Sequence, residues 1–219
     1  MTAGRDTAGS GAPRADVTLS TDRRLVAAAE RLFAERGIDA VSLRAVMAAA
    51  GANVASVHYH FGSKDALVRA VIRARGGEIS VRRAELLDAA EAGAPSARAL
   101  AEAFVRPVAD AMAAGGGDWV TVVADVITVN HGALRQMTEE FAGQAVRFTE
   151  LLTRLHPELP PRTVRFRLTQ AMTFTFQTLG DRDRLRDILA LSGTHLTAEE
   201  VLAELLDTVT AILAGPPDR

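Results

Sequence analysis

The stretch SLRAVMAAAGANVASVHYHFGSK, residues 42–64, decides the fold. Ser42 is a favourable N-cap residue for a helix that starts after it. Apolar residues then recur at the spacing of one helix face, at Leu43, Val46, Met47 and Ala50. Gly51 can adopt the left-handed backbone conformation that ends a helix. The first half of the stretch therefore predicts a short amphipathic helix with a tight turn after it.

The second half of the stretch predicts another short helix. Asn53 can cap it, and Val57 and Phe61 are one turn apart and point inward. The solvent side then carries Val54, Ala55, Ser56, His58, Tyr59 and His60. A short helix with this exposed face fits the major groove of DNA, which is wide enough to admit a helix. The two helices together indicate a helix-turn-helix.

Four short motifs carry a family resemblance: LFAERG at 32–37, SLR at 42–44, AG at 50–51 and above all YHFGSK at 59–64. Their layout, from Thr21 to about Leu67, resembles the DNA-binding domain of the TetR family of bacterial transcriptional regulators. The resemblance implies an all-α protein of about nine helices. It implies a tail at 1–20, which we expect to be disordered, a helix-turn-helix domain at 21–66, and a ligand-binding and dimerisation domain at 67–214.

The resemblance also assigns contacts to DNA. Lys64 is the only lysine in the chain and Tyr59 the only tyrosine, and both stand where TetR relatives contact the phosphate backbone. His58 falls where relatives often carry an aromatic residue facing the groove, and His60 either contacts phosphate or braces the turn. The full set of expected DNA contacts is Ser42, Arg44, Asn53, Val54, Ala55, Ser56, His58, Tyr59, His60 and Lys64.

The distribution of charge agrees with this assignment. The net charge of the whole chain is −2, but residues 1–75 hold 11 basic and 7 acidic residues, whereas residues 76–219 hold 14 and 20. The excess of positive charge, which favours phosphate, therefore lies where the helix-turn-helix is expected. A metal site at His58 and His60 is rejected, because residues two apart on a helix point about 200° apart.

The remaining chain predicts further helices separated by glycine and proline. Thr21 is expected to cap a first helix that ends at Gly37, and a helix from Lys64 is expected to bend or end at Gly76-Gly77 and to continue to about Ala92. Later helices are expected at 96–114, from Asp118 to about 130, at 134–156, at 162–179 and at 197–214, with a loop at Gly115–Gly117. The charged run 181–187 lacks the pattern of a calcium loop and is expected to be exposed.

The composition bounds the class of protein. There is no cysteine, and the most hydrophobic run, 119–129, is interrupted by Asp125, so no membrane helix is expected. Residues 1–19 lack the apolar segment of a signal peptide. We therefore expect a cytoplasmic protein that needs no cofactor and no metal and binds no membrane.

The family resemblance implies a small-molecule effector and a homodimer that binds double-stranded operator DNA. The last two helices, 162–179 and 197–214, would pair with their copies as a four-helix interface. The expected lining of the effector pocket is mainly apolar, which suits a hydrophobic effector. It comprises Phe104, Met112, Trp119, Val123, Asn130, His131, Met137, Phe141, Phe148, Met172 and Phe176.

Three functions compete on the sequence. The first is a dimeric, ligand-responsive transcriptional regulator, most often a repressor, in which the helix from Lys64 is the one element that touches both domains. The second is a helical enzyme; against it, the chain lacks a cysteine nucleophile, a His-Glu-x-x-His motif and a phosphate-binding glycine loop. The third is an architectural DNA-binding protein without a ligand, which a solidly packed C-terminal domain would favour.

Overall fold

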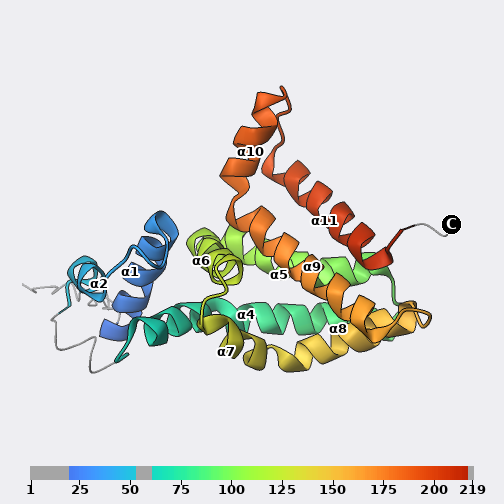
Figure 1. The fold of residues 1–219 in the computed structure, drawn as a ribbon, viewed down its shortest axis with the longest axis horizontal. Coiled ribbons are helices and arrows are strands. Elements are labelled where there is room, and N and C mark those ends of the chain that lie inside the picture. Colours follow the sequence, from blue (N-terminus) through green and yellow to red (C-terminus); the bar gives the residue numbers. More distant parts are fainter. Residues whose placement is uncertain (1–19, 53–60, 217–219) are drawn as a thin grey trace, which may run out of the picture.

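The computed structural model describes residues 20–52 and 61–216, and this part of the chain is helical throughout without a strand. The N-terminal part comprises α1, Thr21–Arg36, and α2, Leu43–Ala50. The longest helix, α4, runs from Lys64 to Ala92 and leads from this part along the rest of the molecule (Figure 1). The expected all-α architecture is confirmed.

Seven helices and one wider turn complete the described chain. They are α5, Ala97–Ala111; the π-type turn η1, Met112–Gly116; α6, Gly117–Thr128; α7, Ala133–Glu140; α8, Ala142–Leu155; α9, Pro161–Gly180; α10, Arg182–Leu191; and α11, Ala198–Ala214. α5 packs against α4 and α11, and α9 packs against α6 and α11, so these helices form the body of the C-terminal part (Figure 1).

The N-terminal part folds around the residues that the pattern predicted. Leu25, Ala28, Ala29, Leu32 and Phe33 of α1 are buried, as are Val46 and Met47 of α2. Ile38 and Val41, in the connection between the two helices, are also buried and close the base of this small core. Burial of these nine side chains supplies the main stabilisation of a unit this short.

Several helix ends differ from the prediction. Ser20, not Thr21, caps α1, because its hydroxyl accepts the Arg23 N–H at 3.4 Å. α6 begins at Gly117, one residue before the expected start at Asp118, which lies in its first turn. The expected loop at the three glycines is the π-type turn, in which Ala114, Gly115 and Gly116 leave helical geometry, Gly115 with φ of 86°.

Two further differences concern whole helices. The helix expected at 134–156 is two helices, because the backbone breaks at Phe141 and the Phe141 ring lies against α4 near Gly76. The charged run 181–187 is exposed, as expected, but it belongs to the regular helix α10. α4 passes through Gly76-Gly77 without interruption, and Gly76 is itself buried.

Within the described residues, no single helix has both the length and the apolar composition needed to cross a membrane. One bent pair, Ala97–Thr128 with Ala133–Glu139, meets the criterion by length and composition when its two arms, which meet at 106°, are taken together.

Candidate functional site

The first helix of the helix-turn-helix is built as its sequence predicts. The Ser42 hydroxyl accepts the Ala45 N–H at 3.2 Å and so satisfies one of the free amides at the start of α2. Gly51 has φ of 59° and ψ of 36°, the left-handed conformation in which a Cβ is unfavourable. Ala52 N–H then donates to Met47 O at 3.0 Å and closes the turn. These contacts direct the chain out of α2 into the segment expected to face DNA.

α4 begins on the far side of that segment. The Ser63 hydroxyl accepts the Ala66 N–H at 3.1 Å and caps the helix. Lys64 Nζ donates to the carbonyl of Asp39 at 3.1 Å, so the ammonium ties the start of α4 to the connection between α1 and α2. An ammonium has three donors, and two of them stay available for a phosphate oxygen. The free amides of the first turn of α4 favour an anion at the same place.

The structure places three of the ten expected DNA contacts. Ser42 and Arg44 are exposed at the start of α2, and Lys64 is partly exposed at the start of α4. The other seven lie outside the described residues: Asn53, Val54, Ala55, Ser56, His58, Tyr59 and His60. The DNA-contact assignment of all ten therefore stays a prediction.

The N-terminal part is joined to the C-terminal part by more than α4. α1 packs against both α4 and α6. Ile38 N–H donates to Asp125 Oδ2 at 3.3 Å, which links the α1–α2 connection to α6 directly. The expectation that the helix from Lys64 alone touches both parts is wrong, because α6 lies against α1 as well.

Two more polar contacts connect α4 with this region. Trp119 of α6 is buried, and its indole N–H points at the carbonyls of Val71 and Ile72 on α4, both at 3.0 Å. Arg75 of α4 lies 3.7 Å from Glu30 of α1. Burial raises the pKa of Glu30, Arg75 opposes this shift, and the charge of Asp118 adds to it.

At the start of α7 a weaker polar link reaches α4. His131 Nε2 lies 3.7 Å from Asp65 Oδ1, and His131 Nδ1 accepts the Ala133 N–H at 3.1 Å. His131 stands in the connection between α6 and α7, after Asn130, which has φ of 52°. The connection therefore contacts the first turn of α4, one residue from Lys64.

The expected pocket residues lie mostly in the C-terminal core. Phe104, Trp119, Val123, Met137, Phe148 and Phe176 are buried, whereas Met112, Phe141 and Met172 are partly buried. The rings of Phe104 and Phe148 stack with centroids 3.9 Å apart, and Trp119 lies 6.2 Å from Phe176. These side chains fill space against one another, and their role as ligand contacts stays a prediction.

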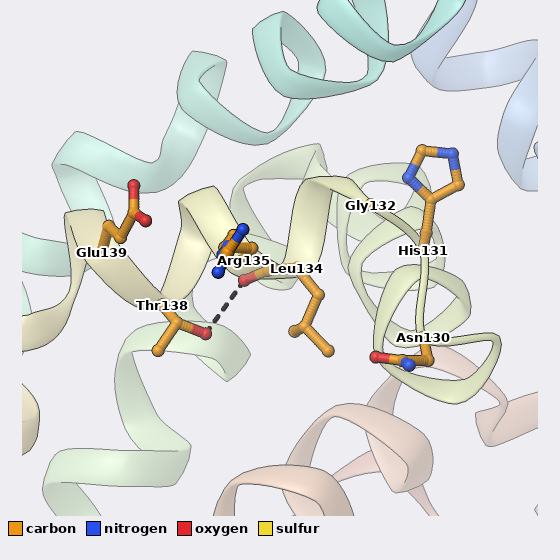
Figure 2. A pocket seen from close by; sticks show the side chains of 7 residues that line it. All are labelled: Asn130, His131, Gly132, Leu134, Arg135, Thr138 and Glu139. Atoms are coloured by element: carbon orange, nitrogen blue, oxygen red, sulfur yellow. Dashed lines mark hydrogen bonds between the residues drawn. The ribbon is translucent and has the colours of Figure 1, made fainter.

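Asn130 and His131 lie elsewhere, at an open hollow of about 500 Å³. Its lining comprises Asn130, His131, Gly132, Leu134, Arg135, Thr138 and Glu139. In Figure 2 the side chains of Asn130 and His131 point away from one another, and Thr138 donates to the carbonyl of Leu134. The polar groups of this hollow do not converge on a common point.

Two residues at helix contacts were missed by the sequence reasoning. Asp125 stood out only as an interruption of an apolar run, yet a lone carboxylate in such a run signals a buried acceptor that needs a donor. Arg83 of α4 is 8% exposed and carried no recognisable signal of its own. The available signal was Pro107, which falls inside the expected helix 96–114 and must leave one carbonyl of that helix without its donor.

In the described part of the chain, α1 and α2 form a small core beside the start of the long helix α4, with a larger helical body behind it. The sequence matches the model of the bacterial regulatory proteins of the tetR family over residues 25–71. Residues 102–211 match the tetracyclin repressor-like C-terminal domain. The chain belongs to the TetR family and is a DNA-binding transcriptional regulator.

Solved structures share the fold at low sequence identity. AmtR of Mycobacterium smegmatis is 17% identical, with a TM-score of 0.57 over 94% of this chain and 92% of its own. The multidrug-binding protein EbrR, solved with imidazole, is 21% identical, with a TM-score of 0.51 over 94% of this chain and 100% of its own. GusR of Salmonella enterica is 15% identical, with a TM-score of 0.52 over 93% of this chain and 100% of its own. No curated protein matches the sequence.

Proposed function

We propose that the protein is a ligand-responsive repressor that binds a palindromic operator as a homodimer and leaves it when a small effector binds. The observation that carries this proposal is the continuity of α4 over 29 residues, from Lys64 beside the helix-turn-helix to Ala92 in the C-terminal body. A helix is stiff along its axis, so a displacement of its C-terminal half moves its N-terminal end.

Residues 21–66 would then bind DNA, and residues 67–214 would bind the effector and dimerise. On the DNA side, Lys64 and Tyr59 are assigned to phosphate, and His60 either to phosphate or to bracing the turn. Val54, Ala55, Ser56 and His58 are assigned to the groove. Phosphate contacts fix the position of the protein, and contacts to base edges select the sequence. The exposed Arg44 and Ser42 at the start of α2 are further contacts to the backbone.

Exposed apolar side chains support the dimer. Phe166 and Phe174 of α9 are 64% and 37% exposed, and they lie two turns apart on one face. On α10, Ile188 and Leu191 are 53% and 89% exposed, and that helix buries no residue. α10 projects from the body beside α9 and α11 (Figure 1). Such a surface is typical of a face that a second copy covers.

The effector is proposed to bind among the apolar residues of the C-terminal domain. EbrR, which shares the fold, is a multidrug-binding protein and supports a ligand of this kind by analogy. A second candidate, a DNA-binding protein without a ligand, is favoured by the tight contacts among the expected pocket residues, such as the stack of Phe104 on Phe148. The two candidates differ in whether any small molecule changes operator affinity.

The proposal is tested by selecting duplexes from a random DNA library with the purified protein and footprinting the selected sequence. A palindrome protected over two half-sites about 34–36 Å apart supports a dimeric regulator. Protection of a single asymmetric half-site by a monomer would reject it. Repeating the footprint with small-molecule extracts separates the two candidates, because only the repressor loses protection.

A further inference from the structure

Arg83 is a buried cation in the middle of the C-terminal body. It lies on α4 and is 8% exposed, so almost the whole guanidinium is removed from water. Burial lowers the pKa of Arg83 to about 10, which still leaves the side chain protonated at neutral pH. The protein therefore keeps a full positive charge between α4, α5 and α8.

The hydrogen bonds of Arg83 engage its Nε and Nη1 atoms. Arg83 Nε donates to the carbonyl of Ala103 at 3.2 Å. Within a helix that carbonyl would accept from residue 107, but Pro107 has no N–H to give. Arg83 Nη1 donates to Gln144 Oε1 at 3.3 Å, and Gln144 Nε2 donates to the carbonyl of Ser80 at 2.8 Å. These acceptors are all neutral.

These hydrogen bonds do not compensate the positive charge of Arg83. In the part of the chain that the structure describes, no carboxylate forms an ion pair with it. Its neighbour Arg82, by contrast, pairs with Glu85 and Asp110 on the surface. A glutamine could supply a donor to Ala103 without the cost of burying a charge. A buried, unpaired guanidinium is instead suited to an anion that arrives from outside.

The surroundings of Arg83 are aromatic. The Phe141 ring lies over the guanidinium, with the ring centroid 5.9 Å from Cζ. Phe104 follows Ala103 on α5, and it stacks on Phe148, which lies one turn beyond Gln144 on α8. An anionic group beside Arg83 would therefore have apolar ring surfaces on both neighbouring helices for the rest of the ligand.

Phe141 covers the path to this charge. It is partly exposed and stands at the break between α7 and α8, where the backbone leaves helical geometry. Its ring packs against α4 at Gly76, whose missing Cβ would lie 3.6 Å from the ring. A ligand that reaches the guanidinium from this side would have to displace the Phe141 ring.

We propose that Arg83 binds the carboxylate or sulfonate group of a small amphipathic effector, whose apolar part takes the place of the Phe141 ring among the core aromatics. This inference rests on the proposed function and narrows the effector from a hydrophobic molecule to a hydrophobic monoanion. It also gives Arg83 a role that its bond to Ala103 alone does not require.

The test compares two fluorescent probes that share one ring system. The first, 8-anilinonaphthalene-1-sulfonate, carries an anion, and the second, N-phenyl-1-naphthylamine, lacks it. Each is titrated into the full-length protein, into Arg83→Gln and Arg83→Lys, and into Arg154→Gln, which removes an exposed arginine of α8 as the matched control. Circular dichroism and operator binding are recorded for every variant, so that loss of fold or of DNA binding is seen separately.

Arg83→Gln is expected to lower the affinity for the anionic probe by roughly 10-fold or more, because a bond to a charged group is lost. The affinity for the neutral probe should not change. Arg83→Lys, which keeps the charge, should recover most of the affinity, and Arg154→Gln should lose none. Phe141→Ala leaves Arg83 in place and removes the ring that the ligand must displace, so it should tighten and speed binding of the anionic probe.

Equal affinities of the wild-type protein for the two probes, or equal losses for both in Arg83→Gln, would overturn the inference. Absence of sulfonate binding by the wild-type protein would do the same. Any of these three results would reject the role of Arg83 but not the proposed function, provided that the protein still binds a palindromic operator. A protein that binds the sulfonate through Arg83 but binds no operator would instead reject the proposed function.

Discussion

Lys64 illustrates what one residue can do at the junction of two segments. Its ammonium holds the Asp39 carbonyl, and its remaining donors are assigned to a phosphate oxygen. Lys64→Ala should therefore weaken binding about equally for every DNA sequence and lower the salt dependence of binding by about one unit. Fluorescence anisotropy over a salt series, on selected and random duplexes, measures both effects.

The matched control is Arg184→Ala, which removes an exposed cation on α10, far along the chain from the helix-turn-helix. It should leave the salt dependence unchanged. Tyr59→Phe should also weaken binding about equally for every DNA sequence, but without changing the salt dependence, because the hydroxyl carries no charge. Substitutions of Ser56 or Val54 should instead change which operator is preferred. If Lys64→Ala altered the preferred sequence at constant overall affinity, the assignment of Lys64 to phosphate would be wrong.

Glu30 should make stability depend on pH. Burial raises the pKa of Glu30 above 4.5, against the opposing charge of Arg75, so the folded chain holds this proton more tightly than the unfolded chain. As pH rises from 4.5 through the raised folded pKa, the free energy of unfolding falls, and it stays lower above that window. Glu30→Gln removes this fall.

Urea unfolding at pH 4 and pH 7.5 measures the effect. The stability of Glu30→Gln relative to wild type should increase between the two pH values. Glu35→Gln, on the exposed side of the same helix, is the control for a general change in charge. A relative stability of Glu30→Gln that is the same at both pH values would show that ionised Glu30 carries no burial cost.

The residues that the sequence predicted well are those whose role is local. Ser42 and Gly51 act on backbone within four residues of themselves. The Ser63 cap and the Thr197–Glu200 capping box are equally local in the structure. Asp125 and Arg83 act on backbone of other helices, at Ile38 and Ala103. Such partners are fixed by packing, which the spacing of residues along one helix does not encode.

At the scale of elements, two glycines in helices should respond oppositely to alanine. A Cβ on Gly180 would lie 2.6 Å from Ala124 Cβ, because the end of α9 crosses α6 at that point, and the Gly180 carbonyl accepts the Thr121 hydroxyl there. Gly180→Ala should cost about 1–3 kcal/mol through overpacking. Gly77, inside α4, has no atom of another residue within 4 Å of the position that a Cβ would take, and Gly77→Ala should stabilise by about 0.4–1 kcal/mol.

Thermal and urea unfolding of the two variants gives the comparison directly. Both changes add one methyl group, at Gly77 in the interior of α4 and at Gly180 at the last position of α9, so a loss of stability in Gly180→Ala alone reports the close crossing of α9 over α6. Equal stabilisation by both substitutions would mean that the two helices separate readily at Gly180.

Helix boundaries show where sequence patterns lose their power. The apolar period of 134–156 continues across Phe141, so the pattern predicts one helix where the chain forms α7 and α8. The break brings Phe141 onto α4, and that gain comes from a contact distant in sequence. α10 was missed as a helix because it buries no residue and therefore shows no apolar period directed at this chain's core.

For the whole molecule, the first question is how two copies meet. If α9 forms the proposed dimer face, Phe166→Glu places a charge in an apolar interface and should convert the dimer to monomer at micromolar concentration. Sedimentation equilibrium measures this mass. Val146→Glu on α8, whose valine is 56% exposed, is the matched control and should stay dimeric. If Phe166→Glu stayed dimeric, the dimer interface would lie on another surface of the protein.

The second question is how an effector is sensed at the DNA. α4 and α6 both reach the N-terminal part, α6 through the bond from Ile38 to Asp125 and through its packing on α1. An effector that fits better when the two copies of α4 are spread shifts the dimer toward that state, by no more than its differential affinity for the two states. Spreading moves the recognition helices off the ~34–36 Å spacing of successive major grooves.

Coupling of this kind amounts to ~1–3 kcal/mol, or a ~5–150-fold loss of operator affinity, and operator must weaken effector binding by the same factor. Calorimetry of an identified effector, with and without saturating operator, measures that factor. Asp125→Ala removes the acceptor of Ile38 and should reduce the factor while leaving effector binding to the DNA-free protein intact. Equal effector affinities with and without operator in the wild-type protein would mean that this molecule is not the signal. An unchanged factor in Asp125→Ala would show that the bond from Ile38 to Asp125 carries none of the coupling, which would then pass through α4 or through the packing of α6 on α1.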